Sequence, residues 1–155
     1  MSTTTQLEHW ASKNIPHFLG VFAADTLPDP EVAARNAPTA FVVNYDPHEL
    51  PGSHWVACRI APHAVEWFDS FGLAPEADDI ILGHQTKFRG WLEAVCHRLG
   101  LMEFIWNTAD LQGLSARTCG NYALWFAQHG SSKGWEKFGP SPEANDRLIQ
   151  RLVQL

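Results

Sequence analysis

A cysteine at the start of a predicted helix is the most reactive feature of the sequence. The run Ser-Ala-Arg-Thr-Cys-Gly-Asn-Tyr places Cys119 just before a stretch of apolar residues, which predicts a helix over residues 119–128. In the first turn of a helix, unpaired backbone N–H groups and the positive end of the helix dipole lower the pKa of a thiol. Cys119 is therefore the candidate nucleophile.

Three residues that precede Cys119 in the chain, His54, Asp69 and Gln112, could complete the catalytic machinery of a thiol hydrolase. His54, in Gly-Ser-His-Trp, heads a predicted strand, and Asp69, in Phe-Asp-Ser-Phe-Gly, ends the next one. If the two strands form a hairpin, Asp69 can accept a hydrogen bond from one imidazole nitrogen while the other takes the thiol proton. The side chain of Gln112 and the backbone N–H of Cys119 would then donate to the oxyanion of an acyl-transfer step.

Each of these residues also has an ordinary structural interpretation. A cysteine at a helix start is more often a small buried hydrophobe than a nucleophile, and Asp69 could belong to a simple turn after a strand. The joint order His54, Asp69, Gln112 and Cys119 favours the catalytic interpretation. Cys58 and Cys96 are predicted to be core thiols, and no metal site is expected, because zinc requires closely spaced pairs of ligands that converge on one point.

Two further residues are predicted to border the substrate cleft. Trp55 directly follows the candidate base, so it is expected to wall the cleft while it also packs in the core. Gly120 directly follows the candidate nucleophile and permits a close backbone approach behind it.

These motifs resemble those of the adenovirus maturation protease (adenain) family and its wider clan, which includes the proteases that process SUMO-like proteins. The shared elements are Gly-x-His-Trp, an aromatic-acid-x-Phe-Gly segment, and Gln-Gly followed by Ser-x-x-Cys-Gly. Weaker similarity covers most of the chain, from Phe18-Leu19-Gly20 to a closing helix within residues 140–155. Asp69 stands where the adenovirus enzymes carry glutamate and follows the SUMO-processing branch. The chain has no evident counterpart of the cysteine that links the adenovirus activating peptide.

The resemblance implies an adenain/Ulp-like cysteine protease fold and three possible functions. The first is an endopeptidase that matures viral structural precursors at small, glycine-containing sites, within the host cell and virion. The second is a protease that acts after Gly-Gly of ubiquitin-like modifiers, and the third is an inactive peptide-binding module. The chemistry requires no cofactor, and whether a peptide or DNA activates the chain stays open.

Composition limits the protein class and its partners. With 155 residues and 45% hydrophobic residues, the chain is predicted to be one domain, residues 1–155, with its own core. A net charge of −6 with scattered basic residues gives no strong DNA-binding signal. The sequence has neither an apolar run of membrane-spanning length nor an export signal. Three cysteines are an odd number and do not suit a disulfide framework, and the lack of an export signal predicts an intracellular, reducing compartment.

The elements that must position the four residues follow from hydrophobic spacing. Strands are predicted over residues 39–44, 54–60, 64–69 and 102–106. Helices are predicted near residues 3–15, over 88–99 with Gly100 as its stop, over 119–128, and from Ser141-Pro142 onward. The expected fold class is α+β, with a small, mostly antiparallel sheet flanked by helices.

Overall fold

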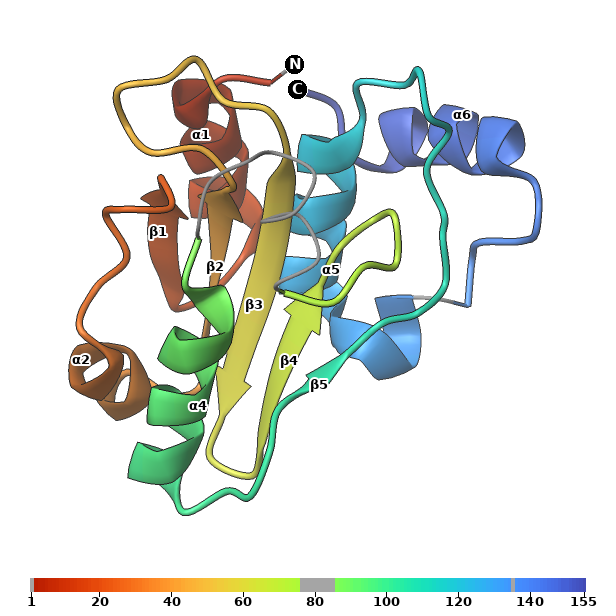
Figure 1. The fold of residues 1–155 in the computed structure, drawn as a ribbon. Helices are drawn as coiled ribbons and strands as arrows, with labels where there is room; N and C mark the ends of the chain where they lie inside the picture. Colours follow the sequence, from red (N-terminus) through yellow and green to blue (C-terminus); the bar gives the residue numbers. More distant parts are fainter. Residues whose placement is uncertain (1, 76–85, 135) are drawn as a thin grey trace.

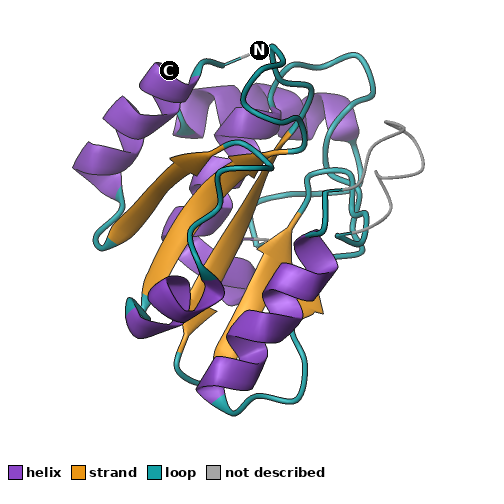
Figure 2. Ribbon diagram, turned by 60° about the vertical axis from the view of Figure 1, so that its left-hand side comes forward, coloured by secondary structure: helices purple, strands orange, loops and turns teal. Residues whose placement is uncertain are grey.

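In the computed structural model, which describes residues 2–75, 86–134 and 136–155, a five-stranded sheet lies between two layers of helices (Figures 1 and 2). The strands are β1 (Phe18–Phe22), β2 (Thr39–Asn44), β3 (Trp55–Ala61), β4 (Ala64–Phe68) and β5 (Ile105–Trp106). The helices are α1 (Thr4–Asn14), α2 (Pro30–Arg35), α4 (Phe88–Leu99), α5 (Cys119–Gly134) and α6 (Pro142–Leu152).

The strands lie side by side in chain order, from β1 to β5. The ladders β2–β3 and β3–β4 are antiparallel and make up the centre, whereas each edge strand pairs in parallel with its neighbour. The predicted α+β fold with a mostly antiparallel sheet is confirmed. Because β3 and β4 form a hairpin, the start of β3 and the end of β4 lie at the same end of the sheet, and α5 begins there too (Figure 1).

Both faces of the sheet are covered, so strand β2 is buried along its whole length. In β2, Val42 packs into the core beneath α5, whereas Phe41 and Val43 pack into the core beneath α2 and α4. Successive side chains of a strand point to opposite faces, and all six residues of β2 are buried. Burial of each large apolar side chain contributes about 1.5–3 kcal/mol. Strand β2 therefore contributes side chains to both core layers.

The helix boundaries follow from local capping. Thr3 and Gln6 form a reciprocal capping box at α1, and the Ser141 side chain caps α6 with Pro142 in its first turn. Helix α4 ends at Gly100, whose φ of 72° lies in the left-handed region that glycine adopts readily. The predicted starts of the first and last helices and the predicted stop at Gly100 are confirmed.

Three elements differ from the sequence prediction. Strand β1 was not predicted, because its residues lack polar alternation, and all five are only partly buried at the sheet edge. The predicted strand 102–106 is wrong in length, since only Ile105–Trp106 pair with β4. Helix α5 continues beyond residue 128 to Gly134 and changes direction at Gly130, where φ is 75°.

Within the described ranges, none of the helices has the length and apolar character needed to cross a membrane.

Candidate active site

The hairpin of β3 and β4 brings His54 and Asp69 together. His54 immediately precedes β3 and Asp69 immediately follows β4, so both side chains lie at the end of the sheet where α5 begins. The Nε2 atom of His54 lies 2.8 Å from Oδ1 of Asp69. Both residues are buried, Asp69 completely. The predicted contact between imidazole and carboxylate is therefore present in the structure.

The carboxylate of Asp69 is held on every side. Its Oδ2 accepts a hydrogen bond of 2.8 Å from the Tyr45 hydroxyl, and its Oδ1 accepts one of 2.8 Å from the backbone N–H of Phe71. The amide of Asn107 binds the Asp69 backbone, because its Oδ1 accepts from the Asp69 N–H and its Nδ2 donates to the Asp69 carbonyl. These contacts leave the carboxylate one orientation, toward His54.

The imidazole of His54 lies between two aromatic rings. Tyr45 stacks on one side with centroids 5.4 Å apart and an angle of 8°, and Phe71 stacks with centroids 4.9 Å apart and an angle of 23°. With Nε2 bonded to Asp69, only Nδ1 remains for the hydrogen bond between His54 and the thiol of Cys119. The ring therefore bridges the carboxylate and the sulfur.

Charge pairing lowers the pKa of Cys119 in spite of its burial. Burial by itself raises the pKa of the thiol, but the hydrogen bond and charge of His54, with the backbone N–H groups of Trp55 and Gly120, bring the pKa below its ordinary value. Burial likewise lowers the pKa of His54, and this is outweighed by Asp69 and Cys119, which raise it. The two opposite directions favour a thiolate beside an imidazolium at neutral pH.

Gln112 lines the same cleft as His54 and Cys119 and is fixed by two hydrogen bonds. Its Oε1 accepts from the Ser70 hydroxyl at 2.5 Å, and its Nε2 donates to the Ala116 carbonyl at 2.8 Å. A carbonyl can only accept, so the contact with Ala116 identifies the nitrogen end of the amide. An amide nitrogen carries two hydrogens, and one of them remains for a ligand in the cleft.

The cleft has a volume of about 360 Å³ and is lined by three of the four predicted residues, His54, Gln112 and Cys119. The fourth, Asp69, lies behind His54. Its walls come from the segment before β3, the segment after β4 and the loop before α5. They are Gly52, Ser53, His54, Phe71, Gln112, Leu114, Ala116, Arg117 and Cys119. The structure thus gathers His54, Gln112 and Cys119 around one open space, with Asp69 behind His54.

Trp55 and Gly120 do not line this cleft, which differs from the sequence prediction. Trp55 points to the core beneath α5, and its Nε1 donates to the Ser2 carbonyl at 3.0 Å. A Cβ atom at Gly120 would lie 3.1 Å from a methyl carbon of Leu7 and 3.3 Å from the side chain of Ser2. The close approach that Gly120 permits is therefore that of the N-terminal segment.

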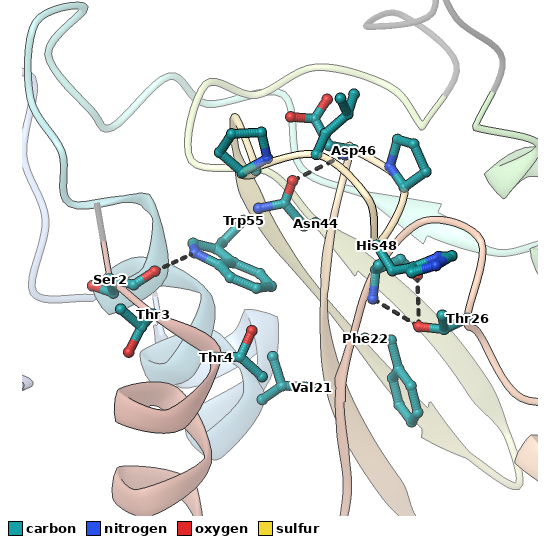
Figure 3. Close-up of a pocket in the computed structure, with 15 residues that line it drawn as sticks. Ser2, Thr3, Thr4, Val21, Phe22, Thr26, Asn44, Asp46, His48 and Trp55 are labelled. Atoms are coloured by element: carbon teal, nitrogen blue, oxygen red, sulfur yellow. Dashed lines mark hydrogen bonds between the residues drawn. The ribbon is translucent and has the colours of Figure 1, made fainter.

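Trp55 instead lines a second, larger hollow of about 640 Å³ (Figure 3). This hollow lies between the start of α1, the end of β1 and the segment from Asn44 to Gly52, and Gly52 also belongs to the catalytic cleft. Asn44 is buried, and its Oδ1 accepts from the backbone N–H groups of Asp46 and Ser53. Its Nδ2 is buried without a hydrogen-bond partner among the described residues.

Several residues of the site carried no usable signal in the sequence. Tyr45 is 24 residues from Asp69, and Asn107 is 38 residues from it. Only the position of Tyr45 directly after a predicted strand could have drawn attention to it. The other thiols, Cys58 and Cys96, lie in the core beneath α2 and α4, as predicted, and burial raises the pKa of both.

Comparison with known proteins gives a structural match without a sequence match. Neither a family model nor a curated protein matches the chain. Among solved structures, the crystal structure of the ASFV pS273R protease aligns with a TM-score of 0.58 and 16% identity, covering 100% of this chain and 68% of that chain. The chain therefore shares the fold of a protease, and the α+β fold expected from the sequence motifs is the one that this comparison finds.

Proposed function

We propose that the chain is a cysteine endopeptidase. The observation that carries this proposal is the unbroken series of contacts from Asp69 through His54 to Cys119, with Gln112 lining the same cleft. The shared fold with a protease supports it. An inactive peptide-binding module would have no need of a buried carboxylate that ionises a thiol.

The proposed reaction proceeds in two acyl-transfer steps. The Cys119 thiolate attacks the carbonyl carbon of the scissile peptide bond, and the oxyanion accepts hydrogen bonds from the Gln112 amide and the Cys119 backbone N–H. His54 donates its Nδ1 proton to the leaving amine as the C–N bond breaks, which leaves a thioester. Water then loses a proton to His54, attacks the thioester and releases the acid and the thiolate.

The proposed substrates are polypeptides with glycine near the scissile bond. The motifs shared with the adenovirus protease family support this choice. In addition, Gly52 lines both the cleft and the larger hollow, so an extended peptide could run from one into the other and place bulkier residues beside Val21 and Trp55 (Figure 3). There the unpartnered Nδ2 of Asn44 could donate to a peptide carbonyl. Viral structural precursors are the first substrate class, and ubiquitin-like proteins are the alternative.

The test compares the chain and its Cys119→Ala variant on a library of glycine-containing peptides and, in parallel, on ubiquitin-like fusions. Hydrolysis of peptides by the chain, with none by Cys119→Ala, is the expected result. Cys96→Ala is the matched control and should cleave at the original rate. Cleavage of the fusions alone would select the alternative substrates. Tight peptide binding without cleavage in either format would instead support the binding module.

A further inference from the structure

The loop between Gln112 and Cys119 joins the oxyanion donor to the nucleophile, yet half of its residues are exposed. Leu114 is 93% exposed, and Ser115 and Arg117 are exposed as well. A hydrogen bond from the Ala116 N–H to the Gly113 carbonyl shapes the bend internally but does not attach it to the rest of the molecule. A catalytic donor must be held to within about 0.5 Å of its working position. Ser70 holds the oxygen of the Gln112 amide, but the Ala116 carbonyl that holds its nitrogen belongs to this exposed loop, so a further contact has to restrain the loop itself.

Asp146, on helix α6, contacts both ends of the loop. Its Oδ2 accepts a hydrogen bond of 3.0 Å from the backbone N–H of Gly113, the residue after Gln112. Its Oδ1 accepts one of 3.1 Å from the hydroxyl of Thr118, the residue before Cys119. The same Oδ1 accepts a third, of 2.9 Å, from the Tyr122 hydroxyl in the first turn of α5. One carboxylate thus ties together the two residues that adjoin the catalytic groups.

Gly113 and Tyr122 are suited to this contact. A Cβ atom at Gly113 would lie 2.8 Å from Oδ2 of Asp146, so only glycine allows this approach of the backbone. Burial, and then the neighbouring Asp146, raise the pKa of Tyr122, so its hydroxyl stays protonated and remains a donor. The contact therefore persists across the pH range in which a thiol protease works.

Helix α6 holds Asp146 firmly in place. Ile149, one turn further, is completely buried, and the Asn145 amide donates to the carbonyls of Leu111 and Gly139. At the end of the helix, the Val153 carbonyl accepts a hydrogen bond of 2.8 Å from Asn121 of α5. Leu111 directly precedes Gln112, so the helix also fixes the chain where it enters the loop.

We propose that Asp146 is a positioning residue that fixes the loop of residues 113–118, so that the amide of Gln112 and the backbone N–H of Cys119 converge on the same oxyanion. This inference rests on the proposed protease function. Asp146 itself touches no substrate, since it does not line the cleft. Helix α6 then supports the active site through the loop, although it does not contact the substrate.

Three measurements on Asp146→Ala separate positioning from general damage. We expect kcat to fall about tenfold or more with KM unchanged, because small misplacements of an oxyanion donor cost about that much or more. Inhibition by a peptide aldehyde, whose adduct with Cys119 carries an oxyanion, should weaken by a similar factor. Alkylation of Cys119 by iodoacetamide forms no oxyanion, so its rate should stay within about twofold of the original.

Two matched variants complete the test. Asp146→Asn keeps an oxygen for the Gly113 N–H and offers an NH₂ to the two hydroxyl oxygens, so it should restore most of kcat. Glu143→Ala removes an exposed carboxylate of the same helix that does not contact the loop, and it should behave as the original chain. If Asp146→Ala does not fold, Thr118→Val removes one of the two loop contacts and should lower kcat about threefold, a part of the loss expected for one donor.

The outcomes that would overturn the proposal are specific. Unchanged kcat and aldehyde inhibition in Asp146→Ala would show that the loop needs no such restraint. A parallel loss of alkylation would show that the variant disturbs the whole site. Amide exchange of Gly113, which we expect to be faster in Asp146→Ala, requires no hydrolysis. If the original chain cleaves nothing while the faster exchange of Gly113 appears as expected, then the proposed substrates are wrong and the positioning role is supported.

Discussion

At the scale of single residues, the site depends on an ion pair formed where burial opposes it. The low-polarity surroundings of Cys119 and His54 disfavour both charged forms, so neither would ionise alone. Each becomes charged because the other does, and because Asp69 and two backbone N–H groups face the pair. The reactivity of Cys119 should therefore differ sharply from that of Cys58 and Cys96.

Thiol labelling tests this difference. We expect iodoacetamide to modify one cysteine rapidly in the folded chain at neutral pH, and Cys119→Ala to abolish this rapid phase. Cys58→Ala and Cys96→Ala should retain it, because burial raises the pKa of both thiols. The modified residue can be identified by mass spectrometry of tryptic peptides. Labelling of Cys58 or Cys96 at a comparable rate would contradict the assignment.

The role of Asp69 predicts a shift in the pH profile. Asp69 raises the pKa of His54, so the imidazolium survives to higher pH when the carboxylate is present. In Asp69→Ala this pKa falls, and the alkaline limb of kcat/KM should move to lower pH while some activity remains. Tyr45→Phe retains the carboxylate and the ring stacking and should leave that limb in place. An identical alkaline limb in Asp69→Ala would show that another group supports His54.

At the scale of elements, the loop before α5 determines the oxyanion site. Gln112 receives its orientation from Ser70, which directly follows Asp69, and from Ala116 within its own loop. The segment after β4 therefore positions both the orienting carboxylate and the oxyanion donor. Backbone contacts strengthen this coupling, because the Ser70 carbonyl accepts from the N–H groups of Leu111 and Gln112.

Removal of the Gln112 amide should affect the chemical step alone. We expect Gln112→Ala to lower kcat by about 10²-fold, which is typical for the loss of one oxyanion donor. Because His54, and not Gln112, lowers the pKa of the Cys119 thiol, alkylation by iodoacetamide should continue at nearly the original rate. Turnover of a peptide substrate and alkylation are measured on the same preparation. A loss of less than twofold in kcat would mean that Gln112 serves only the structure of its loop.

The layer of α2 and α4 should matter for stability and leave catalysis unaffected. Leu92 of α4 is completely buried on the face of the sheet opposite α5. Leu92→Ala should lower the free energy of unfolding by about 2–5 kcal/mol, from lost burial and the cavity left behind. Urea denaturation measures this change. The activity of the folded fraction should stay unchanged, and exposed Glu93→Ala should change stability by less than about 0.5 kcal/mol. A lowered kcat in folded Leu92→Ala would reveal coupling between the two layers.

At the scale of the whole molecule, charge argues against a broad surface for nucleic acid. The sequence has 17 acidic and 11 basic residues, with a net charge of −6. Binding to duplex DNA draws its affinity from counterions released by clustered basic residues, and it weakens steeply with salt. We therefore expect peptide hydrolysis at low salt to be the same with and without duplex DNA. Severalfold stimulation that disappears as salt is raised would show that folding assembles a local basic patch.

The sequence by itself determined which residues could do the chemistry and where they would lie along the chain. His54, Asp69 and Cys119 each stand at the boundary of an element that local patterns specify, namely a strand start, a strand end and a helix start. A hairpin has to place the start of one strand beside the end of the next. The contact between His54 and Asp69 therefore followed from local information.

Only the tertiary structure decided which residues support these groups and which segments surround Trp55. Tyr45, Asn107 and Asp146 reach the site across 24, 38 and 28–33 residues of chain, and no local pattern encodes contacts of that range. Trp55 was expected in the catalytic cleft, but it packs in the core beneath α5, and the N-terminal segment covers it and accepts its Nε1–H at the Ser2 carbonyl. Local spacing fixes the identity and direction of a side chain, whereas its partners depend on how distant segments pack.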